Sequence, residues 1–130
     1  PKEIYSNPNT KFVAEFIGSP QMNLFDCSIK NGIAKIGEAQ VNLDNLININ
    51  DASIGIRPDD IQITDSGKFE SKANLVEYLG SDMIIYSSIG GQDFSSKLSS
   101  KIDVKAGDNF KFDITPSSIH VFDNNTNKKV

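Results

Sequence analysis

Residues 22–36 read MNLFDCSIKNGIAKI, and this stretch indicates the fold of the chain most strongly. Its first half, Met22–Ile29, is compatible with a β-strand, and Ile33–Ile36 can return antiparallel to it. The Asn31-Gly32 pair between them is the strongest short-range signal for a two-residue hairpin turn, because both turn positions need a positive φ. The stretch therefore predicts a β-hairpin.

The rest of the chain repeats this pattern of short strands and polar turns. Phe110 and Phe112 alternate with polar residues in one such strand, and turns rich in Gly and Asn recur about every eight to twelve residues, which is typical of an all-β sandwich or barrel. Residues 47–50 fit either a short strand or an irregular loop. The other predicted strands are Ala39–Leu43, Ser53–Arg57, Ile61–Thr64, Phe69–Leu79, Met83–Tyr86, Asp93–Leu98 and Ile119–Phe122.

A short helix is predicted before the strands. Asn7 can cap it, Pro8 suits its first turn and Gly18 ends it. A helix this short needs a surface to pack on, so we expect it to dock on the β domain or on a preceding domain. Its apolar stripe consists of Phe12, Val13, Phe16 and Ile17.

Composition excludes several classes of function. The chain has 130 residues and a formal net charge of −4, and Arg57 is the only arginine among 13 basic residues. Nucleic-acid modules usually carry a basic face, so a nucleic-acid partner is not expected. No apolar run approaches the roughly 20 residues of a membrane-spanning helix. The single Cys27 excludes an internal disulfide and fits a reducing, cytoplasmic compartment.

Catalytic and metal-binding motifs are not found. Gly32–Gly37 has the glycine spacing of a phosphate-binding P-loop, but Glu38 and Ala39 follow where Lys and Ser or Thr are required. One histidine, His120, and one cysteine, Cys27, cannot complete a structural zinc tetrahedron. We therefore predict no catalytic residue, no cofactor and no metal in this chain.

One corner has two open interpretations. Gly55-Ile56-Arg57-Pro58-Asp59 joins a strand to a turn fixed by proline. Arg57 can form a local ion pair with Asp59 or Asp60, which contributes little where it is exposed. The same rigid corner can instead present one guanidinium to an interface. The two aspartates also suit the first turn of a short helix, where backbone N–H groups are free.

The chain resembles one family along its whole length. Residues 1–23, PKEIYSNPNTKFVAEFIGSPQMN, resemble the junction after the ATPase domain in sugar-importing ABC transporters of the MalK/UgpC type. Gly55-Ile56-Arg57-Pro58 resembles a corner of that family, and Val76–Asp82 resembles its Gly-containing turn. Ile119–Asp123, with Thr126, resembles its closing strand. Asp59-Asp60 and Asn127 depart from the family pattern and leave the transported substrate open.

The resemblance implies a regulatory domain without its enzyme. Residues 1–20 are expected to be a linker and docking helix that follows an ATPase domain, an expectation that also fits a chain opening on Pro1. Residues 21–130 are expected to form a transport-associated OB-like β-barrel. ATP and magnesium belong to the preceding domain, and a second copy of the subunit, the permease subunits and the inner face of the membrane are the expected surroundings. The candidate interface or regulatory residues are Gly55, Arg57, Pro58, Asp59, Glu77, Gly80 and Asp82.

Two other functions remain open from the residues alone. A small-ligand or oxyanion-binding OB module needs converging backbone N–H groups, which Gly80-Ser81 or Gly90-Gly91 could offer. A single-stranded nucleic-acid binder needs exposed aromatic side chains on a basic groove. Phe110 and Phe112 share one face, but ordinary core residues would do the same.

Overall fold

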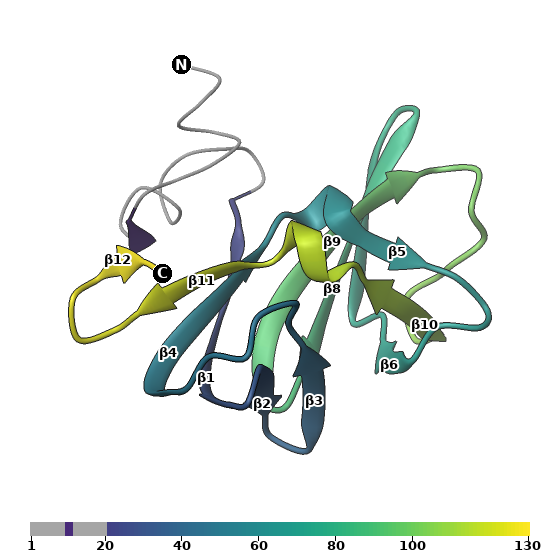
Figure 1. Cartoon of the computed structure of the whole chain (residues 1–130). Helices are drawn as coiled ribbons and strands as arrows, with labels where there is room; N and C mark the ends of the chain where they lie inside the picture. Colours follow the sequence, from purple (N-terminus) through teal and green to yellow (C-terminus); the bar gives the residue numbers. More distant parts are fainter. Residues whose placement is uncertain (1–9, 12–20) are drawn as a thin grey trace.

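The computed structural model describes residues 10–11 and 21–130, and these residues form strands and two 3₁₀ turns (Figure 1). The expected docking helix, with Phe12, Val13, Phe16 and Ile17, lies outside the described residues. The elements are β1 (Asn23–Lys30), β2 (Ile33–Ile36), β3 (Ala39–Asn42), β4 (Ile49–Ile56), η1 (Pro58–Asp60), β5 (Ile61–Ile63), β6 (Phe69–Lys72), β7 (Leu75–Leu79), β8 (Asp82–Ile89), β9 (Gln92–Ser99), β10 (Asn109–Ile114), η2 (Pro116–Ser118), β11 (His120–Asp123) and β12 (Lys128–Lys129).

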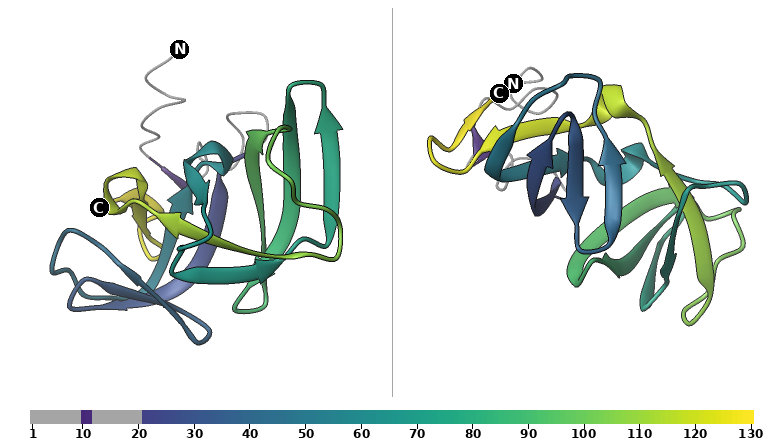
Figure 2. Two further views of the ribbon diagram at one scale, coloured as in Figure 1. Left: turned by 90° about the vertical axis from the view of Figure 1, so that its right-hand side faces the viewer. Right: turned by 60° about the horizontal axis from the view of Figure 1, so that its bottom comes forward.

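The strands form three antiparallel sheets. One sheet has the order β12-β11-β4-β1-β2-β3, the second has the order β5-β10-β6, and the third has the order β7-β8-β9. The expectation of a mainly β chain is confirmed. The expectation of a β-barrel is wrong, because the described strands do not close into one continuous hydrogen-bonded cylinder. Figure 2 shows the sheets wrapping around a shared interior while remaining separate.

The hairpin turns form where the sequence predicts them. Asn31 and Gly32 have φ angles of 51° and 75°, and they join β1 to β2. Gly90 and Gly91, with φ angles of 57° and 78°, join β8 to β9 in the same manner. Two successive positive φ angles match the twist of the flanking strands. These turns therefore set the register of two of the sheets.

Most strands differ from their predicted bounds by a few residues, and two of the differences concern how the chain is divided into strands. The long strand predicted over Phe69–Leu79 is split into β6 and β7, because the backbone of Ala73 leaves the ladder to bond with the loop before β10. Its N–H donates to the Asp108 carbonyl at 2.8 Å, and its carbonyl accepts from Gly107 at 2.7 Å. Residues 47–50 fit either a short strand or a loop in the sequence, and in the structure β4 begins among them, at Ile49.

The core lies where the three sheets face one another. Phe112 from β10 is 1% exposed, and its ring centroid lies 5.3 Å from Phe94, 5.5 Å from Phe69 and 5.7 Å from Phe110. Phe94 in turn lies 5.9 Å from Phe25 of β1. This row of rings connects strands of all three sheets, so burial of aromatic surface helps to hold the sheets together.

The described start of the chain lies beside its end. Thr10 forms an isolated antiparallel bridge with Lys128, and the Lys11 N–H donates to the Asn127 carbonyl at 3.3 Å. The Lys11 ammonium lies 3.8 Å from the Asp26 carboxylate on the outer face of β1. The C-terminal hairpin β11–β12 therefore holds the segment that enters the domain.

Candidate interface and regulatory site

The Arg57 corner is a rigid junction between β4 and a 3₁₀ turn. Arg57 has extended backbone angles (φ −65°, ψ 144°) and precedes η1, in which Pro58 takes the first turn. Asp59 and Asp60 occupy that first turn, as the sequence predicts. Pro58 is fully buried, Asp59 is exposed, and η1 lies against β9. The corner therefore presents Asp59, rather than its proline or its arginine, to solvent.

Arg57 is an interior side chain, with only 5% of its surface exposed. Burial and the Asp59 carboxylate raise the pKa of Asp60, and the smaller opposing effect of Arg57 lowers it. Burial, then Lys129 and then Arg57, lower the pKa of His120 to about 4. The guanidinium thus acts on groups of its own chain. This burial does not fit the expectation that Arg57 pairs directly with a second copy, and it favours a local role at the corner.

Gly55 makes room for a small second core. It lies in β4 between Leu24 and His120 of the neighbouring strands. A Cβ at this position would collide with the Met22 sulfur and would lie 3.2 Å from the Phe122 ring. Met22 is 5% exposed and Phe122 is fully buried. Gly55 is therefore a packing position beneath this outer cluster.

The β7–β8 hairpin carries the other candidate residues and projects from the body of the molecule (Figures 1 and 2). Gly80 turns the chain with a φ of 76° and has open space around it. Glu77 is exposed and accepts a hydrogen bond from the Tyr86 hydroxyl at 3.2 Å. Asp82 lies 4.0 Å from the Lys97 ammonium. The exposed apolar side chains of the same hairpin belong to Leu75, Tyr78 and Leu79.

The structure places the two groups of candidate residues at opposite edges of the sheet β7-β8-β9. The Arg57 corner lies against β9, whereas Glu77 and Gly80 belong to β7 and its turn at the other edge of the order β7-β8-β9. Asp82 begins the central strand. Their joint participation in one interface stays a prediction, in which Asp59, Glu77 and Asp82 are the accessible charges.

The positions that supported the alternative functions have local structural roles. Phe110 and Phe112 are 4% and 1% exposed, so neither ring is available to stack on a base. A Cβ on Gly90 would lie 2.5 Å from the carbonyl oxygen of Ile36, so this part of the Gly90-Gly91 turn packs against β2. Gly32 turns directly into β2 without a following helix, so Gly32–Gly37 does not fit a phosphate-binding loop.

Within residues 10–11 and 21–130, no group of three or more His, Cys, Asp or Glu side chains is arranged to hold a metal ion. In the same part of the chain, no helix has the length and apolar character needed to cross a bilayer.

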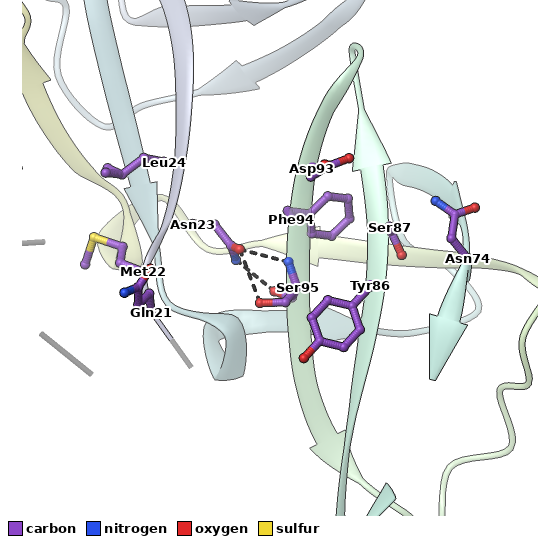
Figure 3. Close-up of a pocket in the computed structure, with 10 residues that line it drawn as sticks. All are labelled: Gln21, Met22, Asn23, Leu24, Asn74, Tyr86, Ser87, Asp93, Phe94 and Ser95. Carbon is purple, nitrogen blue, oxygen red and sulfur yellow. Dashed lines mark hydrogen bonds between the residues drawn. The ribbon is translucent and has the colours of Figure 1, made fainter. Parts of the chain in front are cut away.

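Two side-chain amides that sequence reasoning missed join β1 to β9, and we call them the amide clasps. Asn23 donates from Nδ2 to the Ser95 carbonyl and accepts from the Ser95 N–H, both at 2.8 Å (Figure 3). Gln92 makes the reciprocal pair with the backbone of Asp26, also at 2.8 Å. Each clasp imitates one rung of a strand ladder. Asn23 ends the family-like run of residues 1–23, and this motif is the one sequence signal that marks it. Its partner Ser95 lies 72 residues away, so no local pattern predicts the contact.

Comparison with known proteins gives consistent results. The family model described as "TOBE domain" matches residues 54–122. The oligosaccharides import ATP-binding protein MsmX of Bacillus subtilis is 32% identical across 100% of this chain, which covers 40% of that protein. The sn-glycerol-3-phosphate import protein UgpC of Psychromonas ingrahamii and the alpha-glucoside transport protein AglK of Rhizobium meliloti are each 31% identical. They match 100% and 96% of the chain, which spans 38% of each of them.

Proposed function

Because this chain belongs to the TOBE domain family, we propose that it is the C-terminal regulatory and dimerisation domain of an ATP-binding subunit of an ABC importer for sugars or glycerol phosphate. The ATPase domain then precedes it, holds ATP and magnesium, and works with permease subunits at the cytoplasmic face of the membrane. The similarity of nearly the whole chain to about two-fifths of three import ATP-binding proteins supports this proposal.

In this proposal the domain keeps two ATPase subunits together while their nucleotide-binding halves separate and close. A second contact outside the moving halves raises their effective concentration, so they meet again without diffusing apart. The mechanism requires a surface for a second copy and no catalytic group in the domain itself.

The observation that carries the dimerisation proposal is the β7–β8 hairpin. Leu75, Tyr78 and Leu79 are 58%, 62% and 51% exposed, on an edge strand that projects from the molecule. Leu75 and Leu79 share one face of this strand with Glu77, and Tyr78 lies on the other face. Exposed apolar side chains beside charged groups are typical of protein interfaces. Glu77 and Asp82 supply such charges and can fix the orientation of the partner.

Sedimentation equilibrium of the chain tests this surface. We expect a dimer whose dissociation constant rises at least about tenfold in Tyr78→Ser and in Leu79→Ser, because truncating a central anchor costs about 2 kcal/mol or more and a tenfold change corresponds to about 1.4 kcal/mol. Leu46→Ser is the matched control, since Leu46 is 85% exposed and lies outside the hairpin. A chain that is monomeric at millimolar concentration, or a dimer that neither hairpin variant weakens, contradicts the proposal.

A second measurement tests the division of labour between domains. The purified chain is incubated with ATP and magnesium, and released phosphate is measured. We expect no hydrolysis above background, because Gly32–Gly37 forms a hairpin turn and a strand rather than a nucleotide-binding loop. ATP hydrolysis that co-purifies with the chain through two columns would contradict the assignment to a domain without ATPase activity.

A further inference from the structure

A pocket opens where two of the sheets meet. It has a volume of about 610 Å³ and lies between the start of β1 and the strands β8 and β9 (Figure 3). Small-ligand sites usually measure roughly 300–1,000 Å³. The side chains used in the argument below belong to Asn23, Asn74, Tyr86, Asp93 and Ser95.

The pocket exists because β1 and β9 approach each other without forming a ladder. From Asn23 to Cys27, β1 pairs with β4 on one side. On the other side, the Asn23 clasp reaches across to Ser95. A side-chain amide is longer than a direct backbone hydrogen bond, so it holds the strands further apart than a ladder would. The clasp therefore keeps this space open in the folded state.

The lining combines an aromatic ring with polar groups, of which one, Asp93, is acidic. Tyr86 is 36% exposed, and Asn74 and Asp93 are exposed beside it. Residues 21–24 border the pocket on the β1 side, where Asn23 points toward Ser95 and the Met22 and Leu24 side chains turn away into the outer cluster with Phe122 (Figure 3). Amide and carboxylate oxygens accept hydrogen bonds from hydroxyl groups, and an aromatic ring covers the apolar C–H face of a sugar ring.

The charge of the lining disfavours an anion. Among the described residues that line the pocket, Asp93 is the only acid, and neither Lys nor Arg contributes. The chain as a whole carries a net charge of −4. A phosphate or sulfate group would meet a carboxylate without a compensating cation. The ligand that fits this chemistry is neutral and rich in hydroxyl groups.

We propose that this pocket binds a neutral polyhydroxylated ligand of the saccharide class, with its ring against Tyr86 and its hydroxyl groups on Asp93 and Asn74. The Tyr86 hydroxyl donates to Glu77 in β7. A ligand against Tyr86 therefore lies next to the hairpin proposed to contact a second copy. The nearness of the ligand to a dimer contact rests on the proposed function, whereas the binding itself does not.

Calorimetric titration of the chain tests the binding. Maltose, sucrose and trehalose are titrated separately, and sn-glycerol 3-phosphate and sulfate are titrated at matched ionic strength. We expect saturable binding of at least one disaccharide and no saturable binding of either anion. Tyr86→Ala and Asp93→Ala should each raise the dissociation constant at least about tenfold, which is the loss of about 1.4 kcal/mol. Leu46→Ala is the control, because Leu46 is 85% exposed, lies outside the hairpin and does not line the pocket.

Three results would overturn the proposal. They are the absence of saturable binding for all three disaccharides, binding of an anion instead, and disaccharide binding that Tyr86→Ala leaves unchanged. Circular dichroism of each variant establishes that it is folded before titration. Binding is measured on the chain whatever its oligomeric state, so its failure is distinguishable from a failure of the dimerisation proposal, which sedimentation alone decides.

Discussion

Removing the Asn23 clasp should cost far more stability than removing the Gln92 clasp, although both make two hydrogen bonds of 2.8 Å. Asn23 and Ser95 are 7% and 8% exposed, so Asn23→Ala leaves the Ser95 N–H and carbonyl without a partner in a buried position. A buried unsatisfied group costs about 1–3 kcal/mol. Two such groups predict a loss of about 2–4 kcal/mol, because the adjoining pocket lets water recover part of the cost.

Gln92→Ala is the matched variant. The backbone of Asp26 that Gln92 contacts is exposed, so water replaces the lost hydrogen bonds. We expect a loss below about 1 kcal/mol for this substitution. The difference between the two variants therefore isolates the effect of burial from the number of hydrogen bonds.

Urea unfolding followed by circular dichroism measures both values. An unchanged slope of the free energy of unfolding against urea shows that the variants unfold in the same two-state manner. Equal losses in the two variants, or a loss below about 1 kcal/mol for Asn23→Ala, would refute the reasoning. The interface between β1 and β9 would then be held by apolar packing, with the amides as passive occupants.

Three further predictions concern single residues. Burial and Lys129 lower the pKa of His120 to about 4, so the stability that the neutral imidazole contributes is complete above about pH 6.5 and is lost as the pH falls toward 4. Between pH 7 and pH 4, the free energy of unfolding of His120→Gln should therefore fall by about 1–2 kcal/mol less than that of the wild type, a value discounted for the partial exposure of His120. Thermal unfolding at the two pH values measures this difference. Gly90→Ala should destabilise the chain by at least about 1 kcal/mol more than Gly91→Ala, because both have positive φ but only Gly90 lacks room for a Cβ; equal losses in urea would contradict this. Burial and Asp26 raise the pKa of Cys27 to about 11, so a thiol-specific disulfide reagent at pH 8 should react with it much faster in urea than in the native chain, and equal rates would contradict this.

Local chemistry accounts for the parts of the fold that the sequence predicts. Asn31-Gly32 and Gly90-Gly91 specify their turns through backbone angles that few other residues adopt, and the alternation of Phe110 and Phe112 specifies a strand with one buried face. These features depend on neighbours in the sequence. They predict where strands and turns occur without determining which strands pair.

The missed features depend on distant contacts. The split at Ala73 follows from hydrogen bonds to Gly107 and Asp108, and the separation into three sheets follows from strand pairings that no local pattern specifies. Arg57 looks like a surface arginine in the sequence, yet it is 5% exposed in the fold, next to η1, which lies against β9. The interface role of the candidate residues therefore stays a prediction, and the accessibility of each side chain could be read only from the structure.

The bridge between Thr10 and Lys128 has a mechanical consequence. Antiparallel pairing places Thr10 beside Lys128, so the described start of the chain and its C-terminal strand lie at the same place. Tension applied between Thr10 and Lys128 would separate this pair directly, without shearing the sheets against one another. The contact between the two ends would then open before the core unfolded.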